Sequence, residues 1–324
     1  MENMRYDEQD MRAIVSTGLL NNDAEDSESV FFAQQLEYIK SKTYDEKLAN
    51  LNAAKLFPVS TEADAGAESI SYESYGMVGI AKLIASYADD LPRADVKGTK
   101  VTVDIFSAGT SYGYSTQDIR AAKMKGLPLN ARRALSARRA NDTLINKIAF
   151  KGDKDGKIVG ILDNPNITTA VVKADGTSNS TKWANKTPAQ ILRDLNDAVS
   201  GIVDLTNGVE IPDTIVLPIK QYNYIANTIV PDTSGESILT NFKKNNQYIK
   251  NVVSAVEMKG AGSGGEDVGL IYRKDIDAVS LEIPMAFTQY APQARNLEFV
   301  VPCESRTAGV IVYYPLSMSK MVGI

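Results

Sequence analysis

The stretch that decides the fold is STQDIRAAKMKGLPLNARRALSARRANDTLINKIAFKGDKDGKIVGILDNPNI, residues 115–167. It contains two helix-forming blocks, 116–125 and 129–150, which Gly126 and Pro128 separate. The second block has no internal glycine or proline, so we expect one long helix there. Glycines and an Asn-Pro pair follow this helix and predict that the chain turns at its end.

The long helix is predicted to be amphipathic. At about 100° per residue, small and apolar side chains share one face and polar and basic ones lie roughly opposite. Between positions 120 and 139 the chain carries seven basic residues and no acidic one. Such a stripe is typical of a solvated helix surface, of a surface that docks an acidic partner segment, or of one that contacts a nucleic-acid backbone. The apolar face is predicted to hold Ala134, Ala137, Leu144, Ile145 and Ile148, and the opposite face Arg132, Ser136, Arg139 and Thr143.

The end of the stretch, residues 150–167, looks like a calcium-binding loop because aspartates surround a glycine. An EF-hand loop takes ligands at positions one, three and five and a glutamate at position twelve. Counted from Asp153, position five is Lys157 and position twelve is Asn164. The spacing therefore argues against calcium and predicts a tight turn, in which the aspartates and Gly156 shape the backbone.

Upstream of this stretch, the pattern predicts an extended β-hairpin. SISYESYGMVGIAKLI, residues 69–84, is rich in aromatic and β-branched side chains, and KVTVDIF, residues 100–106, alternates between apolar and polar. A charged segment with proline and glycine joins them. A lone hairpin is marginally stable in water, so this one must pack against another part of the chain or against a neighbour.

Downstream, the pattern predicts a separate α/β lobe. An amphipathic helix begins after the capping residue Thr187, and the buried strand DTIVLP ends at Pro218. Short helices and strands follow. We divide the chain into a helical arm at 1–68, the hairpin at 69–115, a segment with the long helix at 116–185, the α/β lobe at 186–290 and closing strands at 291–324.

Composition narrows the class of protein. The chain has 324 residues, 44% of them hydrophobic, and a formal net charge of −5. This length exceeds what one core usually fills, and the mildly acidic balance argues against a dedicated nucleic-acid binder. The longest apolar runs are short of the ~20 residues of a membrane span, and the N-terminus lacks the order of a signal peptide. We therefore expect a soluble protein that is made in the cytosol.

The sequence offers little for catalysis. It contains no histidine, the usual general base and metal ligand, and one cysteine, Cys303, whose apolar neighbours predict a buried thiol. KGAGSGGED, residues 259–267, satisfies G-x-G-x-x-G but leads into acidic residues and a strand, so it predicts a loop between strands. No spacing singles out a pair of carboxylates. We expect no catalytic, cofactor or metal site.

The order of these parts resembles the major capsid protein of tailed phages, with the Hong Kong 97-type fold that encapsulin shells share. The hairpin strands resemble the arms of that family's extended loop, and residues 115–152 resemble its spine helix. GKIVGILDNPNI resembles the glycine turn and G-I-L-N-x-P run, from which Asp163 departs. Residues 187–202 and 213–226 resemble the first helix and the strand-Pro-helix of the axial lobe, and 297–315 the closing strands.

The resemblance implies an α+β capsid fold with an N-terminal arm, an extended β-hairpin loop, a peripheral lobe with the spine helix and an α/β axial lobe. It implies a non-enzymatic protein whose copies form the hexamers and pentamers of an icosahedral head around double-stranded DNA. The protein would belong to the virion capsid and assemble in the host cytoplasm, without a membrane. Besides itself, its implied partners are separate scaffolding, portal and decoration proteins, with non-specific contact to the packaged DNA.

Charged residues of the hairpin and of the helix are our candidates for contacts between subunits. An unsupported hairpin can lie across a neighbour, and the basic stripe can receive that neighbour's carboxylates. Two alternatives stay open: an encapsulin-like compartment shell, and a carboxylate-based hydrolase of α+β fold. The candidate interface residues are Asp89, Asp90, Arg93, Lys97, Lys100, Arg132 and Arg139.

Overall fold

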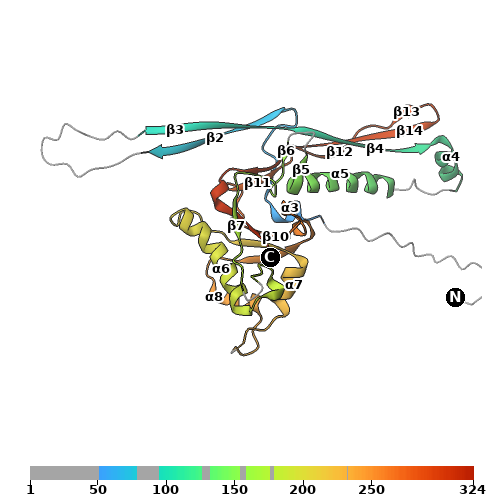
Figure 1. Cartoon of the computed structure of the whole chain (residues 1–324). Helices are drawn as coiled ribbons and strands as arrows, with labels where there is room; N and C mark the ends of the chain where they lie inside the picture. Colours follow the sequence, from blue (N-terminus) through green and yellow to red (C-terminus); the bar gives the residue numbers. More distant parts are fainter. Residues whose placement is uncertain (1–50, 79–94, 126–131, 154–157, 176–178, 232) are drawn as a thin grey trace, which may run out of the picture. The chain divides into compact units, whose positions relative to one another are not determined.

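The chain divides into two units, Met1–Ala49 and Asn50–Ile324, and the computed structural model describes residues of the second (Figure 1). Helices and sheets are both present, which confirms the predicted α+β class. Residues 1–50 of the predicted helical arm lie outside the described residues. The structure describes 51–78, 95–125, 132–153, 158–175, 179–231 and 233–324.

The predicted hairpin is present as strands β2 (Ser69–Val78) and β3 (Asp95–Asp104), which run side by side in Figure 1. They pair antiparallel along their whole length as a two-stranded sheet. β3 begins at Asp95, so part of the segment predicted as a polar tip belongs to the strand. The connection, residues 79–94, lies outside the described residues.

A long pairing between distant segments follows the hairpin. Strand β4 (Phe106–Ser115) pairs antiparallel with β14 (Glu298–Thr307) along the full length of both. Strands β12 (Met285–Gln289) and β13 (Gln293–Arg295) pair with β14 as well. A closing strand near β14 was predicted, but no strand was predicted for FSAGTSYGYS. That segment is small and polar, and its partner lies far away in the chain.

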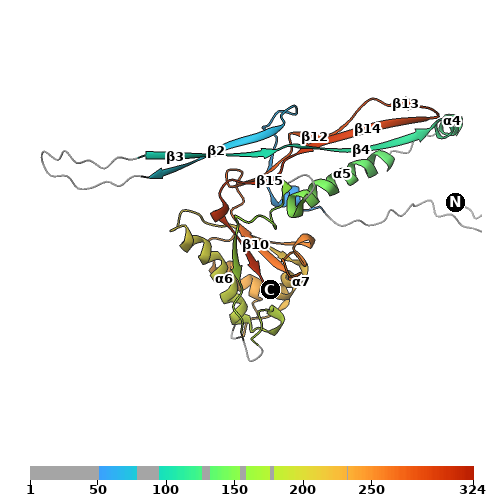
Figure 2. The same cartoon turned by 45° about the horizontal axis from the view of Figure 1, so that its top comes forward.

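The interrupted helical block forms α4 (Thr116–Lys125) and α5 (Arg132–Lys151), as predicted. Helix α5 packs against β4, and Figure 2 shows it running along that strand. Ala137, Ile145 and Ile148 are buried, as expected.

For one residue, the predicted apolar face of α5 was wrong. Leu144 is 39% exposed, whereas Asn141 and Asn146 are buried. The buried face of α5 therefore includes these two asparagines, because both have hydrogen-bond partners inside the protein. Asn141 Oδ1 accepts a bond from Ser305 Oγ at 2.7 Å.

A five-stranded sheet lies between two hydrophobic cores. Its order is β7 (Thr168–Val171), β16 (Met318–Val322), β10 (Val268–Tyr272), β8 (Thr214–Pro218) and β9 (Asn251–Ala255). Alternate residues of a strand point to opposite faces. Val216, Leu270, Tyr272 and Met318 therefore join one core, and Ile215, Leu217, Ile271 and Met321 join the other.

The first core lies between this sheet, helix α5 and a smaller sheet. The smaller sheet has the order β1 (Val59–Ser60), β11 (Val279–Glu282) and β15 (Gly309–Val312). A short helix, α3 (Ala53–Leu56), contributes Leu56, and Phe57 follows it into the same core. The ring of Phe57 lies 5.7 Å from that of Phe150 and 5.7 Å from that of Tyr272.

The second core is covered by helices α6 (Pro188–Leu205), α7 (Ile219–Asn227) and α8 (Ile238–Asn245). Helix α6 begins with the predicted cap. Thr187 Oγ1 accepts a bond from the N–H of Gln190, whose side chain accepts one from the N–H of Thr187. This capping box satisfies two N–H groups that a helix start otherwise leaves unpaired.

The turn after α5 depends on two glycines. Gly152, in β5 (Gly152–Asp153), has φ 69°, and Gly160 follows β6 (Ile158–Val159). A Cβ added to Gly160 would lie 2.2 Å from the backbone N of Gly152. Two backbone segments therefore approach more closely here than a side chain permits. The predicted tight turn from Asp153 to Gly156 stays a prediction. Residues 154–157 of the rejected calcium loop lie outside the described residues.

Candidate assembly surfaces

The hairpin β2–β3 is largely exposed where the structure describes its side chains. Lys100, Val101 and Thr102 are successive residues and all three are exposed. Because successive side chains of a strand point to opposite faces, these three residues lie on both faces of the ribbon. The face that holds Val101 is partly covered, because Ile70, Tyr72 and Val103 on it are half-buried. A ribbon of ten residues per strand spans about 33 Å. It therefore offers an extended surface to a binding partner.

The base of this hairpin is attached to the first core through aromatic residues. The rings of Tyr72 and Tyr313 meet edge-on with centroids 4.9 Å apart. The Tyr313 hydroxyl donates to Glu282 Oε1 at 3.2 Å, and Ser280 Oγ donates to the same oxygen at 2.5 Å. Burial raises the pKa of Tyr72 and of Tyr313. The hairpin is thus anchored at one end.

The basic stripe of α5 is partly neutralised within the chain. Arg133 forms an ion pair with Asp118 at 3.1 Å, donates to the carbonyl of Gly113 at 2.6 Å, and lies over the ring of Tyr114. A hydrogen bond from Arg133 lowers the pKa of Asp118. These contacts hold α5 to the end of β4. Arg138 pairs with Asp142 at 3.9 Å on the exposed helix surface.

A polar network fixes the segment through which the chain enters the described unit. Asn146 Oδ1 accepts bonds from the backbone N–H groups of Asn52 and Ala53, each at 2.9 Å. Glu257 accepts bonds from the side-chain amides of both Asn52 and Asn146 at 2.8 Å. Tyr272 donates to the carbonyl of Leu56 at 2.6 Å. This network was not predicted, although asparagines beside the apolar face of a helix were a signal for it.

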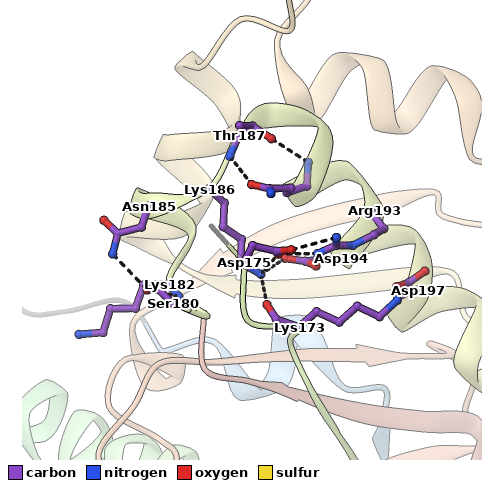
Figure 3. Close-up of polar contacts among 11 residues, drawn as sticks. Lys173, Asp175, Ser180, Lys182, Asn185, Lys186, Thr187, Arg193, Asp194 and Asp197 are labelled. Atoms are coloured by element: carbon purple, nitrogen blue, oxygen red, sulfur yellow. Dashed lines mark hydrogen bonds and ion pairs between the residues drawn. The ribbon is translucent and has the colours of Figure 1, made fainter. Parts of the chain in front are cut away.

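A second polar network holds the loop before α6 (Figure 3). The fully buried Lys186 ammonium lies 2.6 Å from Asp194 and 3.1 Å from Asp175. Arg193 donates to both oxygens of Asp175, and this hydrogen bonding lowers the pKa of Asp175 to about 2. Lys186 also donates to the carbonyl of Lys173 at 2.6 Å. Two cations and two carboxylates balance one another here, so the network stabilises the loop before α6.

The described part of the chain contains no group of three or more Asp, Glu, His or Cys residues arranged to hold a metal ion. Cys303 is buried as predicted, and burial raises the pKa of its thiol. The glycine-rich segment 259–267 lies in the loop between a 3-10 turn and β10. No helix in the described residues is both long and apolar enough to cross a membrane.

A family model for the major capsid protein matches residues 79–324. The chain belongs to the major capsid protein family. No curated protein matches it in sequence. Its family and fold imply a structural role, and the family match supports this over the hydrolase alternative.

Solved structures show which fold this capsid protein has. It is similar to the capsid of Myoviridae phage XM1, with a TM-score of 0.76 at 18% identity, over 90% of this chain and 98% of that one. It is also similar to the capsid of a native GTA particle, with a TM-score of 0.62 at 11% identity, over 94% and 99% of the two chains. For the capsid of cyanophage P-SCSP1u the TM-score is 0.58 at 14% identity, over 94% and 97%. The predicted Hong Kong 97-type fold is confirmed.

The candidate interface residues of this capsid protein lie in different elements. Lys97 and Lys100 belong to β3, and Lys100 is exposed opposite Glu73. Arg132 and Arg139 belong to α5, where Arg132 is exposed and Arg139 half-buried. Their role between subunits stays a prediction. The remaining three, Asp89, Asp90 and Arg93, lie outside the described residues.

Proposed function

We propose that this capsid protein assembles through its hairpin into the hexamers and pentamers of an icosahedral phage head. The observation that carries the proposal is the β2–β3 ribbon, which is exposed at Lys100, Val101 and Thr102 and is attached at its base through Tyr72. A two-stranded ribbon gains little stability by itself. Pairing with a neighbouring copy buries strand edges and apolar side chains that a single copy leaves in water.

The charged candidates supply the specificity of this contact in the proposal. Lys100 on the hairpin and Arg132 on α5 are exposed basic side chains. Together with the charged tip they would pair with groups of opposite sign on the neighbour. Rim charges of this kind guide association and fix its register more than they add affinity.

The other partners belong to the same proposal. The shell would enclose double-stranded DNA and touch it non-specifically, because contacts between basic residues and phosphates carry no sequence information. Scaffolding, portal and decoration proteins would be separate chains. Assembly would take place in the host cytoplasm, and the finished protein would be part of the virion.

Negative-stain electron microscopy and sedimentation of the purified full chain test the proposal. The wild-type chain is expected to form closed shells. A tip variant, with Asp89, Asp90 and Arg93 all changed to serine, is expected to keep its thermal unfolding midpoint and to remain as subunits or small oligomers. Normal shells from this variant would show that the tip charges do not direct assembly.

A control changes the same number and sign of charges elsewhere on the described surface. Asp163, Asp277 and Lys243 are exposed, and their joint change to serine is expected to leave shells intact. If this control also fails to assemble, the loss reflects net charge and not the hairpin. A wild-type chain that forms only a small oligomer with hydrolytic turnover would contradict the capsid role itself.

A further inference from the structure

The sequence contains one Asn-Gly pair, Asn207 and Gly208, in the turn 205–211 that joins α6 to β8. Both residues are exposed. Asparagine deamidates most readily when glycine follows it, because glycine has no side chain to hinder attack by its own backbone nitrogen. Asn207 is therefore the position at which the sequence favours this chemical modification.

The reaction begins at the backbone nitrogen of Gly208. This nitrogen loses its proton to a base in the solvent and attacks Cγ of Asn207, from which ammonia leaves, and a cyclic succinimide forms. Water then opens the ring at one of its two carbonyl carbons and gives aspartate or isoaspartate. The net change consumes one water, releases one ammonia and replaces a neutral amide with a carboxylate.

The folded turn keeps the attacking nitrogen in a hydrogen bond. The N–H of Gly208 donates to the carbonyl of Val203 at 2.8 Å. The N–H of Asn207 donates to the carbonyl of Asp204 at 3.2 Å. Together these bonds form a Schellman motif, which ends a helix with one residue in the left-handed conformation, here Asn207 with φ 50°. The nitrogen of Gly208 can attack only after it gives up this bond, so the end of α6 must open first.

Further contacts stabilise the closed turn. Thr206 Oγ1 accepts a bond from the N–H of Glu210 at 3.1 Å and donates to the carbonyl of Ile202 at 2.8 Å. The carboxylate of Glu210 pairs with Arg273 at 2.8 Å. Arg273 directly follows β10, so the turn is attached to the central part of the five-stranded sheet. Opening of the turn therefore breaks several contacts at once.

We propose that Asn207 is a deamidation site that the folded chain protects and that becomes reactive when the end of α6 opens. The product carries a carboxylate at the C-terminal end of this helix, where the helix dipole is already negative. The exposed carboxylate of Asp204 lies in the same turn of the helix. A chain that deamidates while it is unfolded therefore returns to a less stable fold. This inference does not depend on the proposed assembly.

Peptide mapping of the full-length protein by mass spectrometry tests the protection. Samples are incubated at mildly alkaline pH, folded in buffer or unfolded in guanidinium chloride. Aspartate and isoaspartate at position 207 are expected to form at least about tenfold more slowly in the folded protein, because the hydrogen bonds of the turn must open first. Equal rates in the two samples would overturn the proposal.

Asn296 is an internal control in the same digests. It is also exposed, with φ 52°, but Leu297 follows it, and the leucine side chain hinders attack by its nitrogen. Asn296 should therefore deamidate slowly in both samples. This control separates the effect of the turn from any effect of guanidinium chloride on the chemistry.

A substitution at Thr206 tests whether the turn itself gives the protection. Thr206→Val keeps the shape of the side chain and removes the hydroxyl that holds Glu210, so Asn207 in the folded variant is expected to deamidate about fivefold faster than in the folded wild type. Thr169→Val, on the exposed strand β7, should keep the wild-type rate. If contacts between copies protected the site instead, Thr206→Val would be as slow as the wild type, and this outcome would also overturn the proposal.

The variant Asn207→Asp gives the aspartate product in pure form. Its thermal unfolding midpoint is expected to lie about 1–3 °C below that of the wild type, because the new charge faces the negative end of the helix dipole. Asn207→Gly is the control, since glycine adopts the same left-handed backbone without a charge and should stay close to the wild type. An unchanged midpoint in Asn207→Asp would contradict the predicted loss of stability.

Discussion

The side chain of Asn146 accepts hydrogen bonds from the backbone N–H groups of Asn52 and Ala53, residues that precede it by more than ninety positions. A single amide oxygen thus caps helix α3 and holds it to helix α5. The amide nitrogen donates to Glu257, so three segments meet at one side chain. The network fixes the start of the described part of the chain.

Replacing Asn146 with leucine is expected to destabilise the protein by about 2–4 kcal/mol, because buried N–H groups lose their acceptor and Glu257 loses a donor. Urea unfolding measures this loss. Limited proteolysis should cut the variant near residues 51–57 sooner than the wild type. Asn223→Leu, on the exposed surface of α7, is the control and should change stability by less than about 0.5 kcal/mol.

Removal of the buried Lys186 charge should be costly. In Lys186→Met, Asp194 loses the ammonium at 2.6 Å and shares Arg193 with Asp175, so the buried network keeps one unbalanced negative charge, at an expected cost of about 3–5 kcal/mol. The double variant Lys186→Met/Asp194→Leu should recover most of this loss, which a chemical unfolding series of the variants would show. A double variant as unstable as the single one would mean that Lys186 acts mainly through its bond to the carbonyl of Lys173.

Acid should weaken the same network through Asp175. Its pKa in the folded protein is lowered to about 2 from an ordinary value of 3.8. The carboxylate therefore stabilises the fold above pH ~4, and this contribution is lost as the pH falls from about 4 to about 2. Urea midpoints measured across this range should fall less steeply for Asp175→Asn than for the wild type. Asp197→Asn, whose carboxylate pairs with the exposed Lys173, should keep the wild-type slope.

Two glycine substitutions should act in opposite directions. In Gly160→Ala the new methyl group would meet the backbone of Gly152, so we expect a loss of at least about 2 kcal/mol. In Gly201→Ala the methyl group meets nothing within 4 Å, and the change should stabilise α6 by about 0.5–1 kcal/mol. Thermal unfolding of both variants measures the difference. Equal effects would mean that the turn after α5 can relax.

Local sequence patterns determined many helices, strands and turns of this protein. The long helix, the capping box at Thr187, the buried strand that ends at Pro218, the hairpin arms and the turn at Gly160 were all predicted from the sequence. Each depends on residues that are neighbours in the chain, or on backbone conformations that few residue types adopt. The resemblance of their order to tailed-phage capsid proteins then gave the family.

Tertiary structure decided other features, such as strand pairing and side-chain burial. These features depend on residues that lie far apart in the chain. The segment 106–115 becomes strand β4 through its pairing with β14, although its own composition is weakly strand-like. Asn146 is buried, and Leu144 exposed, because a distant helix supplies partners for an amide. Sequence spacing carries no such information, since only the folded chain brings these segments together.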